Sequence, residues 1–261
     1  MTLELNQFSR ASGSFHPIIP RLFPAFCRVL DDGRACGVGI DWHTMRAVNH
    51  VVITGGSGGL GRAIVEVFSE DSWQIAAPTR AELDVTDPSG IRSYFKSRPE
   101  DLLICAAGII RDAPLARLDE SAWDEVVAVN YQGAAACAAA VLPAMIARGR
   151  GHIVFISSYS ALHPPVGQLA YATAKAALIG LTASLAKEHG AHGIRINAIL
   201  PGYLETPMTG TVSERRKKEI LSDHSLRRFN TPSATAKFIR FLQENLPHTS
   251  GQVFQLDSRR F

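Results

Sequence analysis

Three polar side chains between Ile156 and Lys175 stand at intervals that could support proton transfer. The stretch ISSYSALHPPVGQLAYATAK places Ser158 thirteen residues before Tyr171, and Tyr171 four residues before Lys175. Tyr171 and Lys175 would share one face of a helix, and an ammonium beside a phenol lowers the pKa of the phenol. We therefore expect Tyr171 to act as an acid and a base, with Ser158 facing it from the end of the preceding strand. The alternative is an ordinary strand-end serine, a tyrosine at a helix start and a lysine on a solvated face.

An alternation of short apolar runs and longer helical patterns would position these residues. The expected strands are Val51–Thr54, Gln74–Pro78, Leu102–Ala106, His152–Ser157, Arg195–Leu200 and Gln252–Leu256. The expected helices are Gly59–Ser69, Ser121–Ala147, Leu169–Gly190 and Ser233–Asn245. Strands separated by helices imply a parallel sheet covered on both faces, and right-handed crossovers make this a doubly wound α/β fold.

A glycine-rich turn follows the first expected strand. TGGSGGLGR, from Thr54, places Gly55, Gly59 and Gly61 between a strand and a helix. We expect Gly55 to allow the tight turn, Gly59 to let the backbone approach a pyrophosphate, and Gly61 to let the helix pack closely on the sheet. The start of that helix would face the phosphates. A flexible glycine loop is the alternative, and the turn by itself indicates only a nucleotide.

The composition limits the classes of function. With 261 residues, 46% hydrophobic and 20% charged, the chain can fill the core of one α/β domain. A net charge of +3 without a dense basic block gives no indication of a nucleic-acid partner, and no apolar run approaches the roughly 20 residues of a membrane helix. The cysteines form no CxxC pair, so we expect no metal site, no disulfide and a cytoplasmic location. They are Cys27, Cys36, Cys105 and Cys137.

Four motifs, TGGSGGLG, ISSYS, YATAK and LPGYLETPMT, resemble those of the short-chain dehydrogenase/reductase family in order and spacing, over about Asn49–Asp257. Within the family, the pattern is most similar to 3-oxoacyl-carrier-protein reductases. The resemblance implies that Ser158 holds the substrate carbonyl or hydroxyl while Tyr171 donates or removes its proton. It also implies that Lys175 lowers the pKa of the tyrosine and binds the nicotinamide ribose, and that Asn130 holds a relay water.

The same resemblance implies a nicotinamide dinucleotide along the glycine turn and the neighbouring strand ends. The implied contacts are Gly55, Ser57, Gly59, Leu60, Gly61, Thr79, Arg80, Asp84, Val85, Ala106, Ala107, Gly108, Tyr171, Lys175, Pro201, Gly202, Leu204 and Thr206. At the end of the second expected strand, Thr79 and Arg80 replace the acidic residue of NAD-binding members. Because a guanidinium can pair with a 2′-phosphate, we expect NADP(H) to be preferred over NAD(H). A solvated arginine is the alternative, and Glu82 nearby weakens the expectation.

Three segments depart from the family pattern. Where relatives carry Asn-Asn-Ala-Gly, this chain has Cys-Ala-Ala-Gly at 105–108, which keeps the small residues and loses the amides. Near the C-terminus, QLDSRR keeps Asp257 and replaces both glycines of an Asp-Gly-Gly pattern. Between Pro78 and Asp87, too few residues remain for a crossover of about a dozen. We expect that helix to be absent, Leu83–Val85 to form at most a stub of strand, and about six strands ordered 2-1-4-5-6-7 in family numbering.

Residues 1–44 lie outside the resemblance, and MRAVNHVVITGG from Met45 looks like the beginning of a family member. We expect an N-terminal extension over 1–44 and a single Rossmann-fold domain over 45–261. Weak packing of residues 1–30 and a competent enzyme starting at Met45 would follow. A targeting peptide is the minor alternative for the extension.

The helices that carry Asn130 and Tyr171 are rich in small residues, in AAACAAAV and AKAALIGLTASLA. In relatives these helices pair between subunits, and small side chains permit close approach. We therefore expect a homodimer or a homotetramer. Packing of the same residues within the chain is the alternative.

The segment 206–232, which closes over substrate in relatives, is basic here. Its basic residues include Arg215, Arg216, Lys217, Lys218, Arg227 and Arg228. Positive charge at the mouth of the site would suit an anionic handle, such as a phosphopantetheine on an acyl carrier protein or coenzyme A. A solvated helix face is the alternative.

Two positions expected to be basic in the carrier-protein reductases are Gly149 and His192 here, and Arg148, Arg150 and Lys187 would compensate. We expect NADPH-dependent reduction of a β-ketoacyl thioester, with a small free ketone or secondary alcohol as the alternative substrate. A nucleotide-binding protein without turnover is a further alternative, because fold alone does not fix function. The complete proton-transfer set favours an enzyme.

Overall fold

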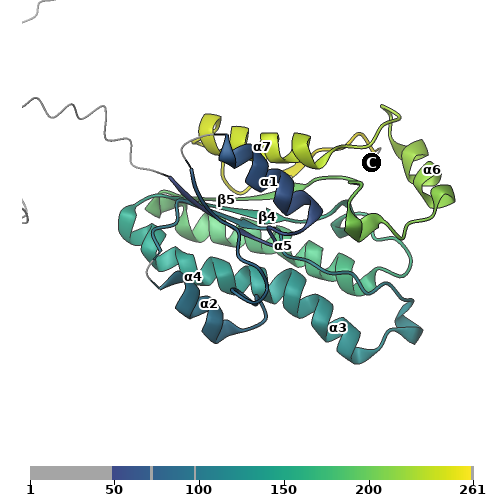
Figure 1. The fold of residues 1–261 in the computed structure, drawn as a ribbon, viewed down its shortest axis with the longest axis horizontal. Helices are drawn as coiled ribbons and strands as arrows, with labels where there is room; N and C mark the ends of the chain where they lie inside the picture. The colour runs from purple at the N-terminus through teal and green to yellow at the C-terminus, as the bar shows by residue number, and fades with distance from the viewer. Residues whose placement is uncertain (1–48, 71–72, 97, 260–261) are drawn as a thin grey trace, which may run out of the picture. The chain divides into compact units, whose positions relative to one another are not determined.

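The computed structural model describes residues 49–70, 73–96 and 98–259 (Figure 1). The expectations about residues 1–30, about the boundary at residue 45, and about Cys27 and Cys36 lie outside the described residues. Cys105 and Cys137 are described, and both are buried with free thiols.

Six parallel strands form one sheet in the described part of the chain. They are β1 (His50–Thr54), β2 (Gln74–Ala76), β3 (Leu102–Cys105), β4 (Gly151–Ile156), β5 (Ile194–Leu200) and β6 (Val253–Gln255). Their order is β2-β1-β3-β4-β5-β6, and every neighbouring pair is parallel. The predicted order is confirmed, since β3 to β6 correspond to strands 4 to 7 of the family numbering. The strand order reverses between β1 and β3, which places a crevice beyond their carboxyl ends.

Helices cover both faces of this sheet (Figure 1). One face carries α1 (Gly59–Ser69) and α7 (Pro232–Asn245), and the other carries α2 (Pro88–Phe95), α4 (Gly133–Arg148) and α5 (Leu169–His189). Successive strand residues point to opposite faces. Val52 and Leu103 therefore pack under α2 and α4, whereas Val51 and Leu102 pack under α1 and α7. Burial on both faces explains why the central strands read as continuous apolar runs.

The segment between β2 and α2 lacks the helix and full strand of the family pattern, as predicted. Residues 77–87, all of them described, form neither helix nor strand. The side chain of Asp87 accepts a hydrogen bond from the N–H of Ser89 and caps α2. Leu83, Ile91 and Phe95 belong to one buried cluster with α4, so this single helix closes the sheet face without a further strand.

The long helix expected over Ser121–Ala147 is divided into three parts. α3 (Glu120–Val127) and α4 are joined by a π-helical turn, η2 (Ala128–Gln132), which contains Asn130. Such turns are rare and occur mostly at functional sites. Apolar periodicity does not distinguish them from a continuous α-helix, which is why the interruption was not predicted.

Two helical stretches, Glu120–Arg148 and Leu169–His192, are long and apolar enough to cross a membrane by length and composition. Both lie on the sheet: α4 packs on β3 and β4, and α5 packs on β5. Their buried residues, such as Cys137 and Leu178, join the hydrophobic core. The apolar character of these helices is therefore that of core helices.

Candidate active site

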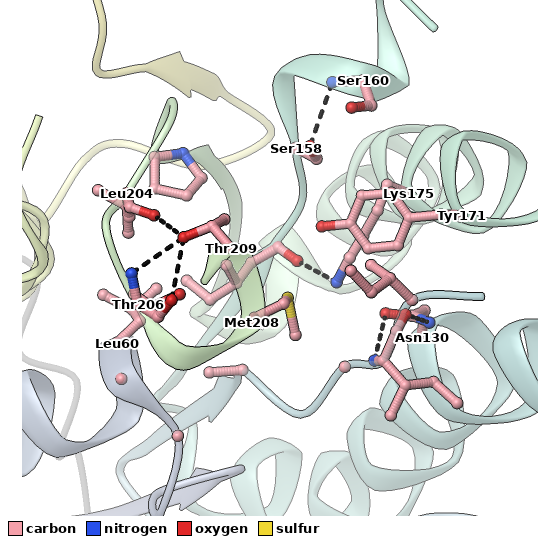
Figure 2. A pocket seen from close by; sticks show the side chains of 18 of the residues that line it. Leu60, Asn130, Ser158, Ser160, Tyr171, Lys175, Leu204, Thr206, Met208 and Thr209 are labelled. Atoms are coloured by element: carbon pink, nitrogen blue, oxygen red, sulfur yellow. Dashed lines mark hydrogen bonds between the residues drawn. The ribbon is translucent and has the colours of Figure 1, made fainter. Parts of the chain in front are cut away.

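A cavity of about 1110 Å³ lies beyond the carboxyl ends of β1, β3, β4 and β5. Every predicted catalytic or cofactor-binding residue lines this cavity except Thr79. Figure 2 shows Asn130, Ser158, Tyr171 and Lys175 gathered on one side of it, opposite Leu60 and Thr206. Residues that lie far apart in the sequence thus surround one volume.

The glycine turn is tightly packed. Gly55 has a φ of 71°, and a Cβ on it would lie 2.7 Å from the backbone of Ala107. A Cβ on Gly61 would collide with the Gly55 carbonyl oxygen, and one on Gly59 would lie 2.7 Å from Cβ of Thr206. The tight turn at Gly55 agrees with the prediction, whereas the close contacts of Gly61 are with Gly55 and Gly56 of the turn, so its packing on the sheet stays a prediction. The approach of Gly59 to a pyrophosphate stays a prediction.

The first turn of α1 presents N–H groups to this cavity. No side chain caps the helix at Gly58, and its first turn holds no acidic residue. The first N–H groups of a helix have no partner within the helix, and together with the helix dipole they favour an anion there. The cradle that the glycines leave open therefore fits the pyrophosphate of a dinucleotide.

Ser158 lies two residues beyond Ile156, the last residue of β4. Its backbone is extended, and its Oγ accepts a hydrogen bond of 3.1 Å from the N–H of Ser160 in the turn η3 (Tyr159–Ala161) (Figure 2). The neighbouring Ser157 Oγ donates to the Lys175 carbonyl at 2.7 Å. The strand end that carries Ser158 is thereby fixed to α5.

Tyr171 and Lys175 occupy one face of α5, as predicted. Lys175 is buried, and its Nζ donates to the Ile156 carbonyl at 2.9 Å (Figure 2). The same Nζ lies 5.7 Å from the centroid of the Tyr171 ring. Strand β4 and helix α5 therefore meet around this lysine.

The protonation of this pair differs from the expectation. Burial raises the pKa of Tyr171 above its ordinary value of 10, a hydrogen bond with Ser158 lowers it, and the charge of Asp112 raises it further. Burial also lowers the pKa of Lys175 from 10.5 to about 8. The predicted net lowering of the Tyr171 pKa is therefore not found in this structure, because desolvation of the phenolate is the largest effect on it.

Asn130 is buried, and its amide holds backbone groups. Its Nδ2 donates to the carbonyls of Ile109 and Val126, both at 2.9 Å, and its Oδ1 accepts from the N–H of Ile109 at 3.3 Å. A Cβ on Gly108 would lie 2.7 Å from that Oδ1. Asn130 therefore fixes the loop after β3, and its relay-water role stays a prediction.

The end of β2 carries a chain of polar contacts. Both the N–H and the Oγ1 of Thr79 donate to Glu82, at 2.7 and 2.9 Å, which explains why Thr79 does not line the cavity. Arg80 lines it and pairs with Asp84 at 3.1 Å, with its side chain 78% exposed. An exposed pair of this kind contributes only about 0–1 kcal/mol, so an incoming phosphate could displace Asp84 from Arg80.

The basic segment forms helix α6 (Glu214–Asp223), whose charges are largely paired within the helix. Arg215 and Arg216 pair with Glu219, and Lys217 pairs with Glu214 at 2.7 Å. Of the basic residues predicted at the mouth, Arg216 lines the cavity. Three of the basic side chains are thus offset by carboxylates of the same helix.

Two of the basic residues expected to compensate, Arg148 and Arg150, flank Gly149 just before β4. Arg150 pairs with Asp101 at 3.2 Å, and Arg148 donates to the Glu100 carbonyl. Both precede β4, whereas the cavity lies beyond its opposite, carboxyl end. These contacts link the start of β4 to the residues just before β3, and compensation by Arg148, Arg150 and Lys187 stays a prediction.

The C-terminal segment that departs from the family pattern packs against the end of α6. The Ser258 carbonyl accepts from the N–H of Ser225 at 2.9 Å, and Arg259 donates to Asp257 at 2.6 Å. The guanidinium of Arg259 stacks on the ring of Tyr159, 3.4 Å from its centroid, and lines the cavity. Arg259, one of the two residues that replace these glycines, therefore forms part of the pocket wall, which sequence reasoning missed.

The fold and the site define a Rossmann-fold oxidoreductase. A family model described as short chain dehydrogenase matches residues 79–217, and the chain belongs to this family.

Relatives of established name are similar over most of the chain. The 3-oxoacyl-[acyl-carrier-protein] reductase FabG of Thermotoga maritima is 34% identical over 233 residues, 79% of this chain and 95% of the relative. The (3R)-3-hydroxyacyl-CoA dehydrogenase of Mus musculus is 40% identical over 147 residues, 56% of this chain and 57% of that protein.

A solved structure of similar fold is a putative NAD(P) dependent gluconate 5-dehydrogenase from Beutenbergia cavernae with bound NADP at low occupancy. Its TM-score is 0.73 at 28% identity, covering 80% of this chain and 95% of that one.

Proposed function

We propose that this protein is an NADPH-dependent reductase that converts the β-keto group of an acyl thioester to a secondary alcohol. The observation that carries the proposal is the gathering of Asn130, Ser158, Tyr171 and Lys175 around one cavity that also contains the glycine turn. A protein that only binds nucleotide has little need for this proton-transfer set. Catalysis is therefore favoured over binding alone.

The cofactor would lie between the glycine turn and Lys175. The uncapped start of α1 would hold the pyrophosphate, and the buried ammonium of Lys175 would bind the nicotinamide ribose. When bound, NADPH supplies the hydride. The small residues Ala106, Ala107 and Gly108 leave room beside it.

The side chains of this chain would supply the proton. Tyr171 is a protonated phenol at neutral pH, because burial raises its pKa, so it can donate to the carbonyl oxygen as the alkoxide develops. Ser158 would donate a hydrogen bond to the same oxygen and orient it. Lys175 would place positive charge beside the phenolate that remains.

The preference for NADPH is tested at Arg80. Arg80→Gln should weaken NADPH binding about 10-fold and leave NADH binding nearly unchanged, because only the 2′-phosphate would pair with the guanidinium. Fluorescence titration with both reduced cofactors measures this. Equal or tighter binding of NADH by the unaltered protein would contradict the preference.

The substrate class is supported by the names of the relatives and by the cavity. The Thermotoga maritima and Mus musculus proteins are named for acyl thioesters, and apolar side chains that line the cavity, Ile110, Val166, Met208 and Val212, would suit an acyl chain. Arg216 at the mouth would face an anionic handle. The pairing of charges within α6 favours the second candidate, a small free ketone.

A screen of NADPH oxidation separates the two candidates. We expect acetoacetyl thioesters to be reduced at least about 10-fold more efficiently than simple ketones, with the advantage falling at high salt as surface charges are screened. If thioesters are no better than ketones at any salt concentration, only a general carbonyl reductase remains.

We also propose a homodimer or homotetramer through α4 and α5 and a cytoplasmic location.

A further inference from the structure

Three hydrogen bonds link the loop after β3, the start of α5 and the turn that carries Ser158. Gln168 Nε2 donates to Asp112 Oδ2 at 2.7 Å. Ser160 Oγ donates to Gln168 Oε1 at 3.0 Å, and the N–H of Ser160 donates to Ser158 Oγ at 3.1 Å. All four residues line the cavity. None of these links was predicted, and Gln168 has no role in the proton transfer described above.

Asp112 determines which group donates and which accepts along this series of hydrogen bonds. An ionised carboxylate only accepts hydrogen bonds, so the amide nitrogen of Gln168 must face it. The amide oxygen of Gln168 then faces Ser160 and accepts from its hydroxyl. The N–H of Ser160 occupies one acceptor site of Ser158 Oγ, which leaves the hydroxyl proton of Ser158 for a group in the cavity.

The loop after β3 is held at both of its ends. Asn130 holds the N–H and the carbonyl of Ile109 at one end. At the other end, the N–H of Ala113 donates to the Gly167 carbonyl at 2.8 Å, beside the contact between Asp112 and Gln168. This loop is therefore fixed both to the π-turn and to the start of α5.

Gln168 also begins the helix that carries Tyr171. It is the N-terminal capping residue of α5, and its carbonyl accepts from the N–H of Ala172 at 2.7 Å. Its side chain and its backbone therefore reach two different parts of the site. A shift of Gln168 would move the Ser158 turn relative to Tyr171.

We propose that Gln168 is a positioning residue that holds the Ser158 turn in register with Tyr171, and that Asp112 sets the orientation of its amide. The proposal rests on the reductase function proposed above. Gln168 exchanges no proton itself. Its effect is on the geometry in which Ser158 and Tyr171 meet the same substrate oxygen, and misplacement of about 1 Å can cost about 100-fold in rate.

A pair of exchanges tests the direction of the hydrogen bonds. Gln168→Glu sets two carboxylates against each other and should lower kcat about 10- to 100-fold, with KM for NADPH unchanged. Asp112→Asn alone should change kcat less than about 3-fold, because the oxygen of the new amide still accepts from Gln168. The double variant should return to within about 3-fold of the unaltered protein, because the amide introduced at position 112 would then donate to the carboxylate introduced at position 168.

Two further variants separate the loss of these hydrogen bonds from the effect of an added charge. Gln168→Met keeps the length of the side chain, adds no charge and should lose kcat like Gln168→Glu. Gln252→Glu is the matched control, since Gln252 is exposed, bonds to the Ser250 carbonyl and does not line the cavity. Unchanged kcat in Gln168→Met, or a double variant no better than Gln168→Glu, would overturn the proposal.

Hydrogen–deuterium exchange gives a readout that needs no substrate. Exchange of a peptide covering 157–163 should accelerate at least about 10-fold in Gln168→Met and Gln168→Glu and recover in the double variant. If the unaltered protein reduces no carbonyl compound, the proposed function fails, and this exchange pattern alone decides whether Gln168 holds the Ser158 turn. Unaltered exchange in both single variants would overturn the positioning role.

Discussion

Tyr171→Phe should reduce the rate of carbonyl reduction about 10³-fold or more while leaving the affinity for NADPH nearly unchanged. General acid catalysis by one side chain contributes about 10²- to 10⁴-fold, and the variant removes only the hydroxyl that donates the proton. The ring would remain to fill its place beside Lys175. Steady-state kinetics with an acetoacetyl thioester and fluorescence titration of NADPH measure the two quantities.

A matched control for this prediction is Tyr94→Phe. Tyr94 lies on α2, makes an edge-to-face contact with Phe95, has the Arg98 guanidinium over its ring, and does not line the cavity. Its variant should retain turnover. Substantial reduction by Tyr171→Phe would show that another group donates the proton, and the mechanism proposed here would then be wrong.

Lys175→Met should stabilise the fold at neutral pH while lowering turnover about 100-fold or more. Burial lowers the pKa of Lys175 from 10.5 to about 8. The folded protein therefore carries a buried ammonium at pH 7 at a cost of about 3 kcal/mol, since each pKa unit corresponds to about 1.4 kcal/mol. Loss of the hydrogen bond to the Ile156 carbonyl offsets about 1 kcal/mol of this. We expect the free energy of unfolding to rise by about 2 kcal/mol.

The gain in the free energy of unfolding of Lys175→Met should become smaller as the pH rises. Below pH 8 the lysine is protonated in both the folded and the unfolded chain, so the full penalty is present. Between pH 8 and 10.5 only the unfolded chain keeps the proton, so the stability of the unaltered protein rises with pH and the advantage of the variant shrinks.

Urea unfolding at pH 7 and pH 9.5 measures the change in free energy. Lys187→Met, an exposed lysine near the end of the same helix α5, is the control and should show no such dependence on pH. The prediction would be contradicted if Lys175→Met were less stable than the unaltered protein at pH 7. It would also be contradicted if the variant changed the free energy of unfolding equally at pH 7 and pH 9.5.

Local rules were enough for much of the architecture. The length of the segment between Pro78 and Asp87 excluded a further crossover, because chain geometry sets the minimum number of residues that a parallel connection needs. The glycine turn was predictable for a similar reason: the positive φ of Gly55 and the close approach at Gly61 are backbone constraints that only glycine satisfies without strain. The gathering of Ser158, Tyr171 and Lys175 followed from helix periodicity and strand order.

Contacts between distant segments and the effects of burial were decided only by the tertiary structure. Gln168 meets Asp112 across 56 residues of sequence, and Arg259 stacks on Tyr159 from the C-terminal segment. The sequence contained these side chains but not the distances between them. The direction of the Tyr171 pKa shift was likewise reversed by desolvation. Periodicity and spacing describe neighbours along the chain, whereas burial and long-range pairing depend on how all the elements pack together. Burial and long-range pairing set the charge and orientation of the proposed catalytic groups.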